Sequence, residues 1–163
     1  MAALGSAFRE LDRFLKREVA KTANGAVRNA ALTVVNDLQT IGPYWDGLFY
    51  NAWEVREGTV DIPADQQGEE WKYGDTPEAH PHKGSFTLDD IPNPRVTYKS
   101  EPLTLTIGNR MEYRDIALDL KPGRIKKEGG GTADQDWYTT YYAGGEMDTR
   151  VKESLQRRIS LPD

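Results

Sequence analysis

The stretch FRELDRFLKREVAKTANGAVRNAALTVVNDLQTI, residues 8–41, decides the fold of this chain. Its apolar and small side chains recur at every third or fourth position: Phe8, Leu11, Leu15, Val19, Ala23, Val27, Ala31, Val34, Leu38 and Ile41. That spacing keeps them on one face of an α-helix. We therefore predict one long helix with Ser6 as its N-cap, Glu10 in its first turn and a stop at Gly42-Pro43. Asn24-Gly25 allows a bend but leaves the phase of the stripe unshifted.

The length of this helix constrains how the chain packs. About 35 residues give a helix roughly 50 Å long at a rise of about 1.5 Å per residue. The 163 residues, 18.4 kDa in all, are expected to form a single domain, 1–163, only about 30 Å across. Part of the apolar stripe must then pack outside its own domain, and we expect it to pack against a neighbouring copy.

The composition excludes several classes of protein. The chain has no cysteine, which removes disulfide frameworks, thiolate zinc sites and thiol nucleophiles. No run approaches the roughly 20 apolar residues of a membrane span, and residues 1–5 lack the basic-then-apolar order of a signal peptide. We expect a soluble protein with no membrane partner. Its core should be modest, because 15 glycines and 9 prolines assign much of the chain to loops.

The net charge of −5 is concentrated in one segment. Residues 59–94 carry two basic and eight acidic side chains, whereas the segments before and after them are nearly balanced. The same segment holds five of the nine prolines and shows no hydrophobic periodicity. We therefore predict an extended acidic arm within the domain. A chain with this charge distribution is not expected to grip DNA through a broad basic face.

The rest of the chain combines strand and helix signals. Alternation and β-forming residues predict strands at four places: 53–56, 96–98, 103–107 and 137–142. Gly108-Asn109 is expected to end the third strand. Helical spacing predicts two further helices: 111–120 and 147–159. The expected fold class is α+β, with the long N-terminal helix packed on a small antiparallel β-sheet, the extended arm, and a short C-terminal helix.

Three sequence patterns could bind a metal, bind phosphate or catalyse a reaction, but each has a plainer interpretation. His80 and His82, with Glu78, could place two imidazoles and a carboxylate beside a metal, but no third histidine exists and a solvated arm is simpler. The Gly-Gly-Gly-Thr run at 129–132 lacks the lysine of a phosphate loop. The 26 carboxylates include no motif that selects an acid and base pair. We predict no catalytic residue, no cofactor and no metal.

Two groups of side chains are candidates for contacts between subunits. The first is the one basic cluster, Lys121, Arg124, Lys126 and Lys127. It could touch nucleic-acid phosphates or the acidic arm of a neighbour, and a solvated loop is the plain alternative. The second is a set of three aromatic residues predicted to be exposed, Trp45, Tyr138 and Tyr142.

The other aromatic residues have a different expected role. Phe49 and Trp53 are assigned to the core. Stacking of exposed rings on single-stranded bases is the competing use of Trp45, Tyr138 and Tyr142. That use normally requires a basic groove, which the sequence does not show.

Three blocks of the chain together resemble the neck and tail-completion proteins of tailed bacteriophages. They are the long helix ending in Gly-Pro, the segment Trp45-Asp-Gly-Leu-Phe-Tyr-Asn-Ala-Trp-Glu-Val55, and the segment Ile107-Gly-Asn-Arg-Met-Glu-Tyr-Arg-Asp-Ile-Ala117. Asp46-Gly47-Leu48 with Trp53 fits the first motif of that family, and the second motif is fitted by Asn109, Tyr113 and Gly123. Leu48 replaces the family's arginine, and residues 59–94 exceed its usual loop. The resemblance covers about two thirds of the chain.

The resemblance implies a non-enzymatic virion protein that is assembled in the host cytoplasm. It would form a homohexameric ring at the junction of head and tail, between the portal or its adaptor ring and the tail tube. Double-stranded DNA would pass transiently through the ring. Six copies would carry a charge of about −30, and a lumen of that sign lets DNA slide rather than stick. The arm would order on contact with an adjacent ring.

Other functions remain open on the same residues. A tail-terminator or head-closure ring would present the same kind of charged, aromatic subunit, and an adaptor or decoration protein would bind only other proteins. A function of a different class is a small hydrolase acting on cell-wall sugars, with two carboxylates from the Asp115 to Asp119 helix and the arm. No motif selects those carboxylates.

Overall fold

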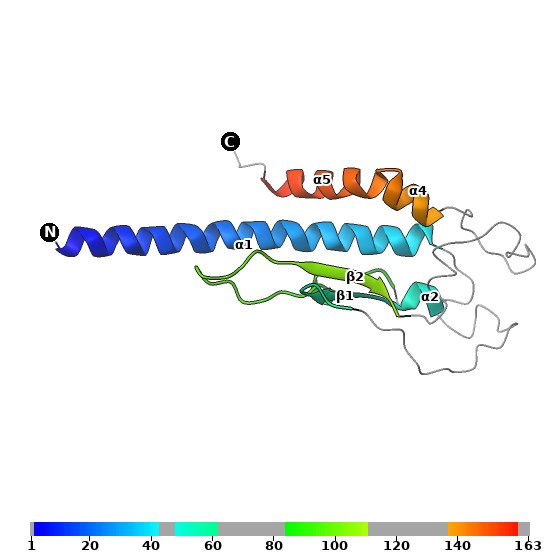
Figure 1. Ribbon diagram of the computed structural model, residues 1–163, viewed down its shortest axis with the longest axis horizontal. Helices are drawn as coiled ribbons and strands as arrows, with labels where there is room; N and C mark the ends of the chain where they lie inside the picture. Colours follow the sequence, from blue (N-terminus) through cyan, green and yellow to red (C-terminus); the bar gives the residue numbers. More distant parts are fainter. Residues whose placement is uncertain (1, 43–47, 62–83, 111–136, 160–163) are drawn as a thin grey trace, which may run out of the picture.

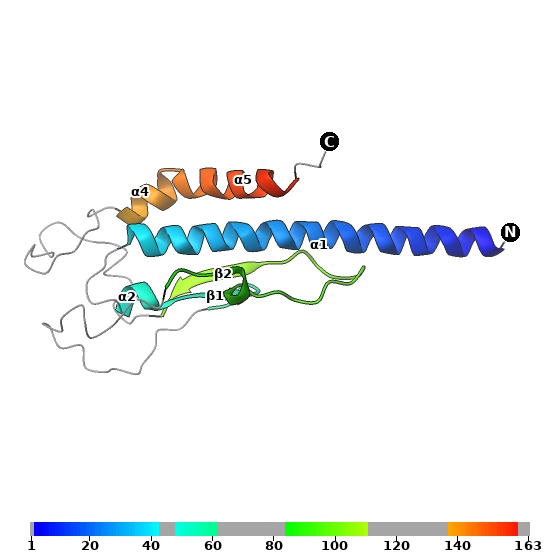
Figure 2. The same cartoon turned by 180° about the vertical axis from the view of Figure 1, so that it is seen from behind.

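The fold is α+β, as the sequence predicts. The computed structural model describes residues 2–42, 48–61, 84–110 and 137–159. Helix α1 (Ala2–Ile41) is the longest element, and every other element lies along it. The C-terminal helices α4 (Trp137–Ala143) and α5 (Glu146–Ile159) lie on one side of α1 (Figure 1). A two-stranded sheet and the short helix α2 (Leu48–Asn51) lie on the other side, and Figure 2 shows the same order from behind.

Helix α1 confirms the long helix predicted from the apolar stripe. It ends at Ile41, where the backbone N–H of Gly42 donates to the carbonyl of Leu38 at 3.1 Å. The predicted start is wrong, because the helix begins at Ala2, so Ser6 and Glu10 lie inside it. Alanine and leucine before the serine are strong helix formers and extend the helix past the expected cap. The helix also continues without interruption through the Asn-Gly pair at 24–25.

Strands β1 (Trp53–Glu57) and β2 (Leu105–Asn109) pair antiparallel, with Trp53 opposite Asn109 and Glu57 opposite Leu105. Strand β2 begins and ends two residues later than predicted, and Gly108-Asn109 belongs to it. The side-chain amide of Asn109 donates to the carbonyl of Phe49 at 2.8 Å, and the N–H of Arg110 donates to the carbonyl of Ala52 at 3.0 Å. These two hydrogen bonds extend the contact between the two strands beyond Gly108.

Two predicted strands are wrong. Residues 96–98 lead into a turn, in which the N–H of Ser100 donates to the carbonyl of Thr97 at 3.2 Å. Residues 137–142 belong to helix α4. Their aromatic side chains favour strands by propensity, but helical spacing brings Trp137 and Tyr141 to the same buried face. The burial of two large rings outweighs the local preference. The predicted helix at 147–159 is confirmed as α5, and the one at 111–120 lies outside the described residues.

The C-terminal end of the predicted acidic arm is anchored on α1. The Asn36 amide donates to the carbonyl of Phe86 at 3.1 Å and accepts from its N–H at 2.8 Å. Arg28 donates to the carbonyl of Ile91 at 3.1 Å, and Ile91 itself is only 2% exposed. The 3-10 helix η2 (Leu88–Asp90) lies between these anchors. This end of the predicted arm therefore packs against α1, and residues 62–83, with His80 and His82, lie outside the described residues.

The core lies against the C-terminal half of α1. It consists of Ala31, Val34, Val35, Leu38, Phe49, Trp53, Val55, Ile91, Trp137 and Tyr141. Phe49 meets Trp53 and Trp137 edge to face, with ring centroids 5.6 and 6.3 Å away. Phe49 is 2% exposed and Trp53 6%, which confirms their assignment to the core. This one aromatic ring therefore connects the sheet side of the molecule to the C-terminal helices.

The substitution Phe49→Ala should lower the free energy of unfolding by about 3–5 kcal/mol, because it leaves a cavity between two tryptophans. Urea denaturation of the dilute protein measures this. Phe8→Ala makes the same chemical change at a side chain that is 66% exposed, and should cost about 0.5 kcal/mol or less. Equal losses in the two variants would contradict the placement of the core.

Candidate functional site

The N-terminal half of α1 carries an uncovered apolar face. Its members are large hydrophobic side chains that are each at least 52% exposed: Phe8, Leu11, Phe14, Leu15 and Val19. We call these five residues the N-terminal stripe. Single exposed hydrophobic residues are ordinary on a protein surface, whereas a contiguous group on one helix indicates a contact surface.

Helix α5 covers the same face of α1 further along. The hydroxyls of Thr33 and Ser154 share a hydrogen bond of 2.8 Å, and Arg150 lies 3.5 Å from the carboxylate of Asp37. Thr33 and Asp37 continue the helical spacing of Leu15 and Val19. In Figure 1, α5 ends about midway along α1, and the N-terminal segment of α1 projects beyond it. The stripe is therefore a helix-packing face that continues past its intramolecular partner.

The flanks of the stripe are charged and exposed. Lys16 pairs with Asp12 at 2.8 Å and Lys21 pairs with Glu18 at 2.9 Å. Exposed pairs of this kind contribute little to stability, so they act mainly to keep the flanks solvated. On the other side of the helix, the Arg13 guanidinium lies 5.2 Å over the ring centroid of Tyr98.

A second uncovered apolar surface lies beside the C-terminal half of α1. It is a cavity of about 440 Å³ between the sheet and the C-terminal helices. Its main apolar lining comes from Val34, Leu105, Ile107, Tyr138, Tyr142 and Met147. We call this cavity the aromatic groove. Asp61 is the charged residue among the side chains that line it.

The structure places two of the predicted interface residues in this groove. The rings of Tyr138 and Tyr142 stack with their centroids 5.8 Å apart and their planes at 2°. Tyr142 is 56% exposed, and Tyr138 is half-buried. They share a face because they are four residues apart in a helix, not because of strand alternation. Trp45 and the basic cluster Lys121, Arg124, Lys126 and Lys127 lie outside the described residues.

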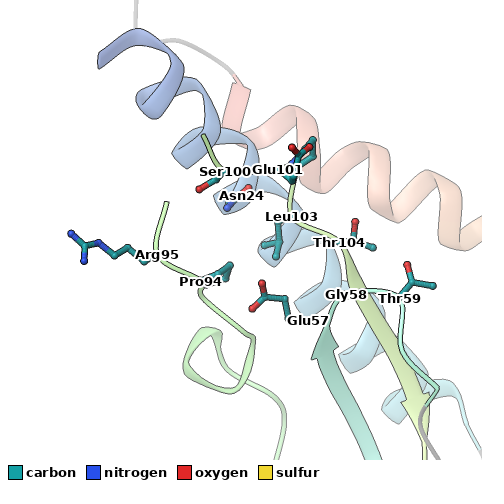
Figure 3. Close-up of a pocket in the computed structure, with 11 residues that line it drawn as sticks. Asn24, Glu57, Gly58, Thr59, Pro94, Arg95, Ser100, Glu101, Leu103 and Thr104 are labelled. Carbon is teal, nitrogen blue, oxygen red and sulfur yellow. The ribbon is translucent and has the colours of Figure 1, made fainter. Parts of the chain in front are cut away.

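A smaller and more polar pocket, of about 360 Å³, lies between α1 and the loop that leads into β2 (Figure 3). Buried Asn24 lines it together with the carboxylates of Glu57 and Glu101. Figure 3 shows the Arg95 side chain directed away from these groups. The pocket offers oxygen atoms to a small cationic group. The sequence does not predict this pocket, because Asn24 is expected only to allow a bend and the two glutamates belong to no motif.

Polar side chains connect α1, α4 and α5 through Asp37, which contacts Tyr141 and Arg150. The phenol of Tyr141 donates to the carboxylate of Asp37 at 3.1 Å. Burial, and then the neighbouring Asp37 charge, raise the pKa of Tyr141 well above its ordinary value of about 10. Burial also raises the pKa of Tyr138, with a smaller effect from Tyr142. Both phenols are therefore neutral at physiological pH and serve as hydrogen-bonding and packing groups.

Within the described residues, no three histidine, aspartate or glutamate side chains gather closely enough to hold a metal ion. None of the described helices combines the length and the apolar character that crossing a membrane requires. Comparison of the chain with protein-family models, with curated proteins and with solved structures finds no match.

The raised pKa of Tyr141 predicts how stability changes at alkaline pH. In the unfolded chain this phenol ionises near pH 10, whereas in the folded protein it stays protonated, so unfolding is favoured as the pH rises above about 10. Tyr141→Phe should cost about 1 kcal/mol at pH 7, through the lost hydrogen bond to Asp37. The difference from the wild type should shrink between about pH 10 and 11.

Urea denaturation across this pH range measures the effect. Tyr142→Phe removes the same hydroxyl from an exposed ring on the same helix and serves as the control, with an expected loss of at most about 0.5 kcal/mol at pH 7. A Tyr141→Phe curve that stays parallel to the wild-type curve up to about pH 11 would show that the phenol is not shielded.

Proposed function

We propose that this chain is a structural subunit of a homo-oligomeric ring at the head–tail junction of a tailed bacteriophage. One observation carries the proposal: the N-terminal half of α1 projects beyond α5 and presents the N-terminal stripe to other molecules. A chain that keeps such a face uncovered is stabilised when another chain covers it.

The size of the stripe fits that role. Five large side chains, each half or more exposed, offer on the order of 500 Å² of apolar surface. An equal area on the partner gives a total of about 1,000 Å², which is near the lower limit of a specific interface. The contact is therefore large enough to join subunits whose assembly is strengthened by further neighbours in a closed ring.

The resemblance to the neck and tail-completion family supports the same function. Trp53 and Asn109 belong to its two different motifs, and in the structure they stand opposite each other in the sheet. The side chain of Asn109 also holds the carbonyl of Phe49, next to the end of α1. The described motif positions thus belong to one structural unit at the end of the long helix.

In this role the ring consists of identical chains, six of them in the arrangement of that family. It lies in the neck of the virion, between the portal or its adaptor ring and the tail tube. The net charge of −5 per chain favours passage of double-stranded DNA, because a strongly basic lumen would bind the phosphates by counterion release.

Light scattering and electron microscopy of the purified chain test this proposal. The concentrated wild type should form closed rings with a central opening. The double substitution Leu11→Asp/Leu15→Asp should abolish assembly, because it places two charges in the buried interface. It should leave the unfolding midpoint of the dilute protein unchanged, since both side chains are 52% exposed.

The matched control is Thr140→Asp/Lys152→Asp, at two exposed positions on α4 and α5. It adds at least as much negative charge and should still assemble. A wild-type chain that stays monomeric at every accessible concentration, and joins no phage particle, would contradict the proposal.

A further inference from the structure

We infer that neighbouring copies of the chain join head to tail, with the N-terminal stripe of one copy seated in the aromatic groove of the next. The inference rests on the proposed function, because it specifies which two surfaces meet in the ring.

The two surfaces lie at opposite ends of one rigid element. The stripe occupies the first turns of α1, and the groove lies beside Val34 and Leu38. Leu15 and Leu38 are separated along the helix by roughly 35 Å, at a rise of about 1.5 Å per residue. Because α1 is continuous, no chain can place its stripe in its own groove. Two other copies can cover these surfaces, one by docking its stripe in this groove and the other by receiving this stripe in its own groove.

This separation determines the type of assembly. A contact between two different surfaces is heterologous, so each copy keeps one free surface for the next copy until the chain of contacts closes. Pairing of stripe with stripe would instead be two-fold. It would stop at two copies and leave the aromatic groove uncovered, with Tyr142 still 56% exposed.

Shape favours the heterologous contact. The stripe is a convex ridge of side chains on a single helix, whereas the groove is a concavity of about 440 Å³. The stacked Tyr138 and Tyr142 rings form one wall of the groove, and rings of this kind are common anchors of interfaces. Phenylalanine and leucine side chains of the stripe would contact these rings and the aliphatic wall formed by Ile107.

The charges around the two surfaces also favour the contact between stripe and groove. Residues 9–21 of α1 contain five basic and three acidic side chains, so the flanks of the stripe are net positive. The groove contributes the carboxylate of Asp61 as the charged group of its lining. Opposite signs across the contact promote docking in this orientation, whereas stripe-on-stripe pairing would bring two positive flanks together.

Because the chain has no cysteine, engineered thiols can map the contact without background. Leu15→Cys and Tyr142→Cys are purified separately, mixed, and oxidised gently. We expect a disulfide-linked heterodimer between the two variants, in roughly tenfold excess over homodimers of either variant, because the docked geometry raises the local thiol concentration. Arg9→Cys and Thr140→Cys serve as matched controls, at exposed positions on the same two helices that point away from Leu15 and from Tyr142, and they should not cross-link above collision level.

Both test positions are at least 52% exposed, so the variants should fold, and circular dichroism verifies this. Val60→Cys, in the groove and 40% exposed, replaces Tyr142→Cys if that variant proves unstable. A Leu15→Cys homodimer in place of the heterodimer would show stripe-on-stripe pairing and overturn the inference. So would a mixture that cross-links no more than the controls do.

Electron microscopy of the same samples separates this inference from the proposed function. Closed rings that fail to form the Leu15 to Tyr142 cross-link would leave the ring function standing and overturn the head-to-tail contact. Open filaments joined by that cross-link would keep the contact and contradict the ring function.

Discussion

The packing of two separate layers onto the C-terminal half of α1 is the constraint on which the rest of the structure depends. A two-stranded sheet alone is marginal in water, and helices of 7 and 14 residues are marginal on their own. Each becomes stable here because α1 buries its apolar face, with Val35 fully enclosed between them. Phe49 closes the end of this arrangement by touching Trp53 on one side and Trp137 on the other. Gly42 allows Trp137 to pack closely against the end of α1, since a Cβ at this position would lie 3.2 Å from the Trp137 ring and 2.6 Å from the Leu38 carbonyl.

Polar side chains at the edges of α1 then fix where each layer sits along the helix. Asn36 holds the backbone of Phe86, Gln39 donates to the carbonyl of Tyr50 at 3.2 Å, and Thr33 meets Ser154 of α5. Apolar contacts set which face is buried, but they tolerate sliding along the axis. Hydrogen bonds between defined partners do not, so the bond between Thr33 and Ser154 fixes the register of α5 along α1. The length of helix left uncovered is a consequence of this register.

The sequence predicts the elements whose stability is local or periodic, and fails where distant contacts decide. Helix α1, strand β1 and helix α5 follow from a single clear period of apolar residues. Residues 137–142 form a helix and not the predicted strand, because strand propensity is visible locally, whereas the burial of Trp137 and Tyr141 depends on the end of α1, about a hundred residues earlier. The anchoring of Phe86 depends on Asn36, fifty residues away. Of the candidate site, the helix length predicts that part of the apolar stripe lies uncovered, but not which part, and Phe14 does not belong to the predicted positions. The aromatic groove does not, because Val60, Ile107 and Tyr142 come from three segments that only the fold brings together.

The middle of α1 and its projecting N-terminal part also differ in the size of the residues they present to a partner. Where α5 and the sheet approach, the helix offers small side chains such as Ala26, Ala30 and Ala31, each at most 7% exposed. Small residues let backbones come close and hold elements rigidly. The projecting part offers phenylalanine and leucine instead, which stand out from the helix and need a concave surface to receive them. A helix extended only for its own stability would end in polar residues, because exposed bulky side chains carry a solubility cost. If a second copy receives them, the angle between stripe and groove is set by one continuous helix, and that angle determines how many copies close the ring.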